Sequence, residues 1–131
     1  MNAQVDDIPV WALEFARLEQ QLEKAIEVAG GGYTLEDLFV GLSEGDFQLW
    51  TRNNTIGITQ IVHEPQVRSL NVFLAGGDMA DLQALLPEVE AFAGPEGCTR
   101  ITLGGRKGWS KSFLRAAGFE PRWVVLAKEL E

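Results

Sequence analysis

Residues 68–130 constrain the fold most, because glycine-containing breaks divide them into alternating strand and helix patterns. Residues 67–75 alternate apolar and polar side chains as a strand does, and residues 79–93 carry leucines at helical spacing behind Asp78, a natural N-cap. A short strand is predicted at residues 99–103. A strand, a helix and a returning strand of this length predict a parallel pair joined by a right-handed crossover. The expected apolar face of the first strand comprises Leu70, Val72 and Leu74.

A further helix and a closing strand are predicted after this unit. Gly104 and Gly105 form a turn before a basic helix over residues 108–117, and Gly118 ends that helix. Residues 123–130 then predict a strand that is apolar on both faces. One face comprises Trp123, Val125 and Ala127, and the other comprises Val124 and Leu126.

The first quarter of the chain predicts two helices. Residues 8–29 place apolar side chains at helical spacing on one face, with Asp6 or Asp7 as the expected N-cap. Three glycines end this helix. The second helix starts at Thr34, whose hydroxyl can accept the backbone N–H of Asp37.

A β-hairpin is predicted next, with strands at residues 47–52 and 55–64. Asn53 and Asn54 separate them, and a two-residue turn of this type is a strong hairpin signal. The predicted order is α-α-β-β-β-α-β-α-β. It defines an α+β class in which an antiparallel meander runs into a parallel pair, with helices on both faces of a mixed sheet.

Length and charge limit the function. The 131 residues predict a single domain, 1–131, with one core. Residues 1–99 hold 4 Lys/Arg and 16 Asp/Glu (−12) and residues 100–131 hold 7 and 3 (+4), which together give the net charge of −8. This charge argues against nucleic-acid binding through phosphate neutralisation. No apolar run is long enough to span a membrane, and no signal peptide is visible.

Four short motifs stand out in the chain: Leu49-Trp50, residues 70–78 (LNVFLAGGD), Gly105-Arg106-Lys107-Gly108-Trp109 and residues 126–130 (LAKEL). With these motifs the chain resembles the small GNAT-like (N-acetyltransferase-fold) proteins encoded by bacteriophages and prophages. The usual first strand of that fold is not evident. The resemblance implies location in the host cytoplasm or the virion, and other phage or host proteins as partners.

The resemblance also implies where acetyl-coenzyme A would bind. In active GNAT enzymes the cofactor enters where the strand matching residues 70–74 splays from the strand matching 99–103. Its pyrophosphate lies on backbone N–H groups at the start of the next helix, where the helix dipole favours an anion. If the cofactor binds here, the resemblance gives its contacts as Phe73, Leu74, Gly76, Gly77, Arg106, Lys107 and Ser110.

Two parts of the GNAT site are missing from the sequence. The segment between residues 75 and 80 lacks the family's pyrophosphate-binding pattern, and Asp78 falls where that anion would lie. The tyrosine that many GNAT enzymes place about four residues before the Gly118-Phe119 pair is replaced by Leu114, and His63, the only histidine, is a weak candidate for a base. No catalytic residue and no metal ligand is therefore predicted.

Three hypotheses follow. The leading one is a catalytically degenerate GNAT-fold protein with a structural or interaction role, with no cofactor and with the virion as one setting. The alternative is an acetyl-coenzyme A-dependent N-acetyltransferase. The third is an acidic inhibitor of a host protein, based on the Asp and Glu residues of the two N-terminal helices. An oligomer is compatible with all three.

Overall fold

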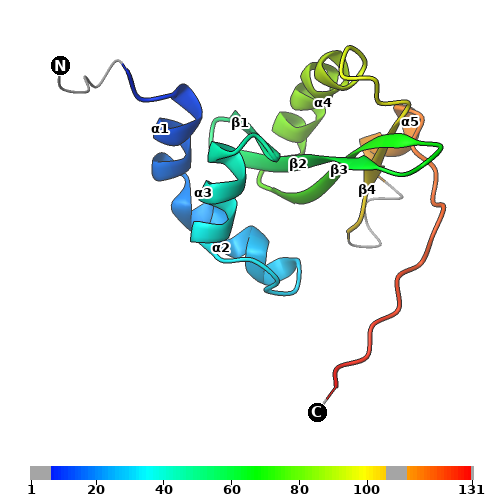
Figure 1. Cartoon of the computed structure of the whole chain (residues 1–131), viewed down its shortest axis with the longest axis horizontal. Coiled ribbons are helices and arrows are strands. Elements are labelled where there is room, and N and C mark those ends of the chain that lie inside the picture. Colours follow the sequence, from blue (N-terminus) through cyan, green and yellow to red (C-terminus); the bar gives the residue numbers. More distant parts are fainter. Residues whose placement is uncertain (1–6, 106–111, 131) are drawn as a thin grey trace.

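The computed structural model describes residues 7–105 and 112–130. These form five α-helices and a four-stranded sheet (Figure 1). The expected turn and helix start at Arg106, Lys107, Trp109 and Ser110 lie outside the described residues. The elements are α1 (Val10–Arg17), α2 (Glu19–Val28), α3 (Leu35–Ser43), β1 (Phe47–Arg52), β2 (Thr55–His63), β3 (Arg68–Gly76), α4 (Met79–Ala93), β4 (Arg100–Leu103) and α5 (Phe113–Ala116).

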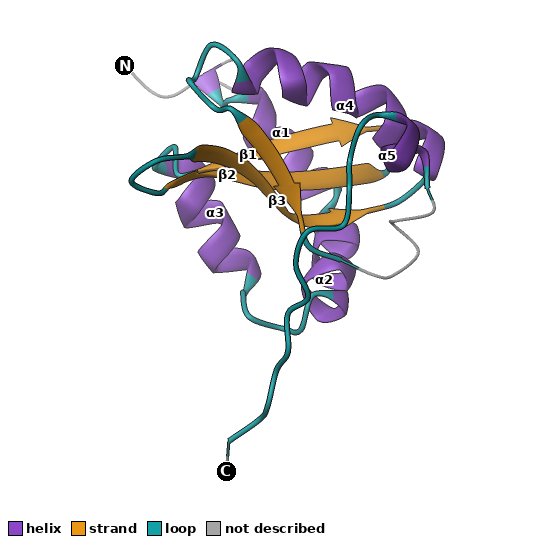
Figure 2. Cartoon of the chain, turned by 90° about the vertical axis from the view of Figure 1, so that its right-hand side faces the viewer, coloured by secondary structure: helices purple, strands orange, loops and turns teal. Residues whose placement is uncertain are grey.

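The sheet has the predicted mixed topology. Its strand order is β1-β2-β3-β4, with antiparallel pairing from β1 to β3 and parallel pairing between β3 and β4. Helices α2 and α3 lie on one side of the sheet, and α4 and α5 lie on the other (Figure 2). The main core lies between α1–α3 and the sheet and contains nine buried residues: Phe15, Leu18, Leu22, Ala25, Leu38, Leu42, Ile56, Ile58 and Leu74.

The expected single helix over residues 8–29 is two helices. Leu18 interrupts it with φ −112° and ψ 22°, and its side chain is only 1% exposed. The break lets α1 contact β1 while α2 contacts β3. The expected cap at Asp6 or Asp7 is also wrong, because the helix begins at Val10 with Pro9 as its N-cap.

Local signals set the next elements as predicted. The Thr34 hydroxyl accepts the Asp37 N–H at 3.1 Å, and the Asp37 carboxylate accepts the Thr34 N–H at 2.9 Å, which is a capping box. The hydrogen bond from the Thr34 backbone N–H to the Asp37 carboxylate lowers the pKa of Asp37, and the Thr34 hydroxyl beside that carboxylate lowers it further. At the hairpin turn Asn53 alone of the two asparagines has a positive φ, 53°.

A β-bulge in β3 reverses the alternation of its side chains between the two faces of the sheet. The register shifts so that Ile58 pairs with Leu74 while Thr59 pairs with Val72, which leaves Phe73 as an extra residue on β3. Leu70 packs on the α4 side, whereas Leu74 packs in the core under α1–α3. The prediction that Leu70, Val72 and Leu74 share one face is therefore wrong, because the extra residue reverses the alternation.

The end of the chain differs most from expectation. Ser112 caps α5 by accepting the Leu114 N–H at 3.2 Å, so the helix begins at Phe113 rather than near residue 108. Residues 123–130 form no strand, because they pair with no edge of the sheet. Their apolar side chains are exposed: Trp123 67%, Val124 86%, Val125 89%, Leu126 90% and Leu130 86%.

Gly41 of α3 gives a stability prediction. A β-carbon at this position would overlap the Phe47 ring, which packs against Tyr33 and Phe73 at centroid distances of 6.1 and 4.9 Å. Gly41→Ala should therefore destabilise the protein by about 1–3 kcal/mol, although alanine ordinarily favours a helix. Urea unfolding monitored by circular dichroism measures this change.

Gly32→Ala is the matched control. No atom lies within 4 Å of a β-carbon built on Gly32, and its φ is not positive. Its free energy of unfolding should stay within about 0.5 kcal/mol of the wild type. A Gly41→Ala protein as stable as this control would contradict the packing assigned to Phe47.

Candidate functional site

The C-terminal half of β3 is the edge at which the resemblance implies cofactor binding. The parallel ladder between β3 and β4 ends where Val72 pairs with Leu103. Beyond that point, Leu74, Ala75 and Gly76 pair only with β2 among the described residues, and Phe73, the bulge residue, pairs with neither strand. The other side of this part of β3 therefore faces no strand in the described structure.

The four expected contacts on this segment have different environments. Phe73, the bulge residue, packs against Tyr33 and Phe47 at centroid distances of 5.1 and 4.9 Å. Leu74 is 2% exposed and belongs to the core. Gly76 ends the strand, and Gly77 has φ 127° at the turn into α4. The other three expected contacts, Arg106, Lys107 and Ser110, lie outside the described residues.

The N-terminus of α4 is capped by the side chain of its N-cap residue, Asp78. The Asp78 carboxylate accepts the backbone N–H groups of Ala80 at 2.8 Å and Asp81 at 3.3 Å. The Asp78 N–H donates to the Thr55 hydroxyl at 2.9 Å. Three of the N–H groups that an anion would need at this helix start already have acceptors.

A second carboxylate adds to this network. Asp81 accepts hydrogen bonds from the Thr55 hydroxyl and from the Asn53 side-chain amide, both at 2.9 Å. The Arg52 guanidinium lies 3.6 Å from the Asp81 carboxylate and is half exposed. Two carboxylates and one guanidinium therefore surround the start of α4 in the described structure. The net negative charge of these three groups opposes the binding of a diphosphate, even though the helix dipole favours an anion.

The hairpin turn beside this network is also held by α1. Arg17 donates to the backbone carbonyl of Asn53 at 2.6 Å and to the Asn54 side chain at 3.1 Å. Glu14 pairs with Arg17 at 2.7 Å, and the hydrogen bonds of Arg17 and Thr51 lower the pKa of Glu14. The turn is thus fixed between α1 and the start of α4.

A small apolar cavity lies between the sheet and helices α4 and α5. Its volume is about 60 Å³, far below the roughly 300 Å³ of ordinary small-molecule sites. Leu114 and Phe113 help to close it, at the place where the family's tyrosine is absent. The lining residues are Trp50, Gly57, Thr59, Val72, Ala75, Leu82, Leu85, Leu86, Val89, Leu103, Phe113 and Leu114.

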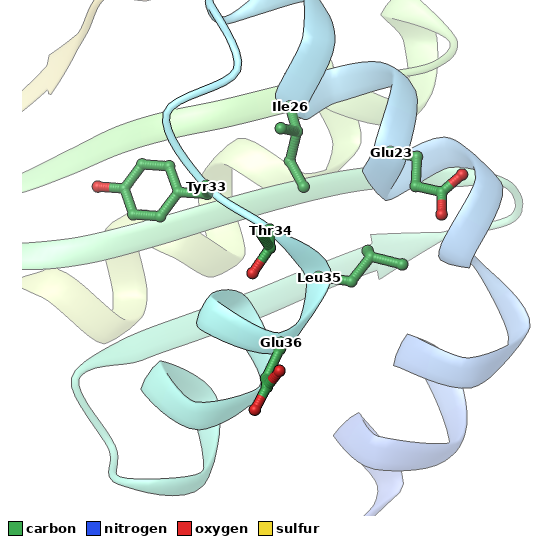
Figure 3. Close-up of a pocket in the computed structure, with 6 residues that line it drawn as sticks. All are labelled: Glu23, Ile26, Tyr33, Thr34, Leu35 and Glu36. Atoms are coloured by element: carbon green, nitrogen blue, oxygen red, sulfur yellow. The ribbon is translucent and has the colours of Figure 1, made fainter.

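A larger hollow opens between α2 and the start of α3, with a volume of about 440 Å³ (Figure 3). Its lining includes the acidic residues Glu23 and Glu36 and the apolar residues Ile26 and Leu35. The Tyr33 hydroxyl points away from the other labelled side chains in Figure 3. The lining contains no cation, so the hollow suits a neutral or cationic group better than an anion.

His63 lies far along the sheet from the start of α4. The β2–β3 ladder runs from Ile56 paired with Gly76 to His63 paired with Arg68, so His63 is at the opposite end from the start of α4. Its side chain is exposed. This position does not suit a base acting beside residues 73–77.

Sequence reasoning did not find the polar network at the start of α4. Asp78 was recognised as a cap, but Thr55, Asp81 and Arg52 come from three different elements and share no motif. Only the pairing of the hairpin with β3 and α4 brings these residues together. The one available signal was the hairpin turn, which predicts that Arg52 and Thr55 lie opposite each other.

Solved acetyltransferase structures share this fold. A predicted acetyltransferase from Clostridium acetobutylicum, solved with acetyl-coenzyme A, matches with TM-score 0.60 and 14% identity over 95% of this chain and 92% of its own. A Trypanosoma brucei acetyltransferase matches with TM-score 0.59 and 10% identity over 88% and 94%. Glucosamine-6-phosphate N-acetyltransferase from Arabidopsis thaliana matches with TM-score 0.51 and 12% identity over 87% and 94%.

These similarities define the fold of the chain as that of the GNAT acetyltransferases. The identities are too low to assign an activity. No protein-family model matches the sequence, and the comparison with curated proteins found no relative. Among residues 7–105 and 112–130, no helix is long and apolar enough to cross a membrane.

Thr55 gives the prediction for this network. Its side chain is 1% exposed, and its hydroxyl both accepts from the Asp78 N–H and donates to Asp81. Thr55→Val keeps the shape but leaves both partners without that hydroxyl, so the protein should lose about 1–3 kcal/mol of stability. Urea unfolding measures the loss.

Thr99→Val is the control, because Thr99 is exposed and its backbone N–H, rather than its hydroxyl, donates to the Arg68 carbonyl. This variant should unfold like the wild type. Equal stability of the two valine variants would show that the Thr55 hydroxyl does not hold α4 to the hairpin.

Proposed function

We propose that the chain is a non-catalytic protein with a GNAT fold that acts by binding other proteins. The observation that supports this proposal is the state of the α4 N-terminus. Asp78 and Thr55 occupy the N–H groups that would bind the pyrophosphate, and Asp81 adds a second negative charge. A coenzyme A diphosphate would have to displace these bonds and approach two carboxylates.

The small cavity and the missing acid support the same proposal. The space between α4, α5 and the sheet is too small for a pantetheine arm, and the side chains at residues 113 and 114 carry no proton to give to a leaving thiolate. Following the sequence resemblance, we expect the partners among phage or host proteins. The virion setting rests on that resemblance.

The second candidate function is acetyl transfer from acetyl-coenzyme A. Its supporting observation is the unpaired side of β3 at residues 73–76, which could pair with a pantetheine amide. A structure with this fold has been solved with acetyl-coenzyme A. In this case Arg106 and Lys107 would hold the phosphates.

Isothermal titration of the full chain with acetyl-coenzyme A tests the proposal. We expect no binding heat, because the α4 N–H groups are already satisfied. Micromolar binding, about −8 kcal/mol, would overturn the non-catalytic proposal. The double substitution of Arg106 and Lys107 with alanine should then weaken binding by about 1–3 kcal/mol.

Lys24→Ala combined with Lys128→Ala is the matched control, because it removes two exposed cations from other parts of the chain. It should leave any cofactor affinity unchanged. The virion setting has a separate test, namely the presence of the protein in purified phage particles. Its absence from the particles would remove the virion setting and leave the binding proposal to the titration.

A further inference from the structure

The N-terminal helices leave large apolar side chains in solvent on their outer side. Phe39 and Val40 of α3 are 42% and 45% exposed. The Phe39 ring also packs against the rings of Trp11 and Phe15 on α1, at centroid distances of 5.2 and 5.4 Å. The aromatic contact that joins α3 to α1 is therefore partly on the molecular surface.

The hollow beside the start of α3 continues this surface. It has a volume of about 440 Å³, lies between α2 and α3, and has Ile26 and Leu35 in its lining (Figure 3). Leu35 is four residues before Phe39, and Glu36 is four residues before Val40, so each pair lies along one side of α3. We call the hollow together with three neighbours the α3 groove; these neighbours are Trp11, Phe39 and Val40.

The α3 groove faces away from the sheet. Leu38 and Leu42 are the large α3 side chains buried in the core between the helices and the sheet. Because an α-helix turns by 3.6 residues, Glu36 and Val40 lie on the opposite side of α3 from these two leucines. An occupant of the groove would therefore contact the helices and leave the end of β3 free.

The charge around the α3 groove is strongly negative. Residues 7–46 hold 9 Asp/Glu and 2 Lys/Arg, which gives a net charge of −7. Glu23 and Glu36 line the hollow from its two bordering helices, and both are exposed (Figure 3). Within the described residues neither forms an ion pair, whereas Glu14 pairs with Arg17. Apolar side chains beside unpaired carboxylates are complementary to an apolar stripe flanked by Lys or Arg.

We propose that the α3 groove binds a basic amphipathic helix of a protein partner. The apolar stripe of that helix would lie on Phe39 and Val40, with its Lys or Arg side chains beside Glu23 and Glu36. A helix fits because α3 repeats apolar and acidic positions four residues apart, which is the spacing along one helix face. This inference rests on the protein-binding role proposed above and names the chemistry of the partner.

A second copy of the chain suits the groove less well. In a two-fold dimer the same surface of both copies would meet. Two regions that each carry −7 would then face each other and repel. The charge therefore favours a basic partner over self-association.

Fluorescence anisotropy of a labelled peptide titrated with the full chain tests the proposal. The probe is a peptide of about 18 residues made of Leu, Lys and Ala, with leucines at helical spacing on one face and lysines beside them. We expect a micromolar dissociation constant. The same residues in scrambled order, without an apolar stripe, should bind at least about tenfold more weakly.

Two variants locate the binding in the α3 groove. Glu23→Gln with Glu36→Gln should weaken binding of the striped peptide about tenfold, because two ion pairs with its lysines are lost. Val40→Lys replaces an apolar contact with a like charge and should weaken binding by more than about tenfold. All three positions are exposed, so circular dichroism should show an unchanged fold.

Glu88→Gln with Glu96→Gln is the matched control. It removes the same charge from exposed residues of α4 and of the turn that follows, and α4 lies on the other side of the sheet (Figure 2). Because these sites are distant from the α3 groove and screened by salt, the affinity should change by less than about twofold.

Four results would overturn the proposal. One is the absence of binding by the striped peptide, and another is equal binding by the scrambled peptide, which would show only attraction to a negative surface. The third is an equal loss of affinity in the control variant. The last is self-association of the protein alone, measured by light scattering and abolished by Val40→Lys, which would assign the groove to a second copy.

The acetyl-coenzyme A titration gives an independent answer. A protein that binds neither acetyl-coenzyme A nor the striped peptide keeps the non-catalytic proposal and loses the role of the α3 groove. A protein that binds both keeps the groove and loses the non-catalytic proposal.

Discussion

The hydroxyl of Thr55 joins the β1–β2 hairpin to the start of α4. The packing of α4 on its side of the sheet depends on this connection. The hydroxyl accepts the Asp78 N–H and donates to the Asp81 carboxylate, while Asn53 donates to the same carboxylate. The hairpin turn, the end of β3 and the start of α4 are therefore held at one point. Gly77 approaches Thr55 so closely that a β-carbon on Gly77 would overlap it. The bonds that fix the fold here are the same bonds that occupy the backbone N–H groups at the start of α4.

The bulge at Phe73 has an equally wide effect. By inserting one residue into β3 it turns Leu70 and Leu74 toward opposite layers, so each helical layer receives apolar side chains from the same strand. It also brings Phe73 onto the Tyr33 and Phe47 rings, which connect the α2–α3 loop to β1. The parallel ladder to β4 ends at the residue before the bulge. The end of β3 thus has one unpaired side among the described residues, whereas the backbone N–H groups at the start of α4 beside it already have acceptors.

Signals contained within a few residues predicted the structure well. The Thr34–Asp37 capping box, the Asp78 cap and the asparagine turn each depend on local backbone geometry, and each is found as expected. Periodicity alone was less informative. It cannot show the break at Leu18, where two helices with one continuous apolar stripe must reach different strands. It also cannot show the network of Asp81 and Thr55, because nothing in the sequence brings residues 26 positions apart together before the sheet forms.

The closing segment shows the limit of periodicity most clearly. Residues 123–130 have the composition of a strand, but a strand is defined by its neighbour, and an alternating pattern does not say which edge or which chain provides it. Such a segment on its own exposes apolar side chains and backbone together, which favours association. The start of α4 lies at the other end of β3 from the residues that pair with β4. A strand paired with the outer edge of β4 would therefore lie at the opposite end of β3 from the network of Asp78 and Asp81.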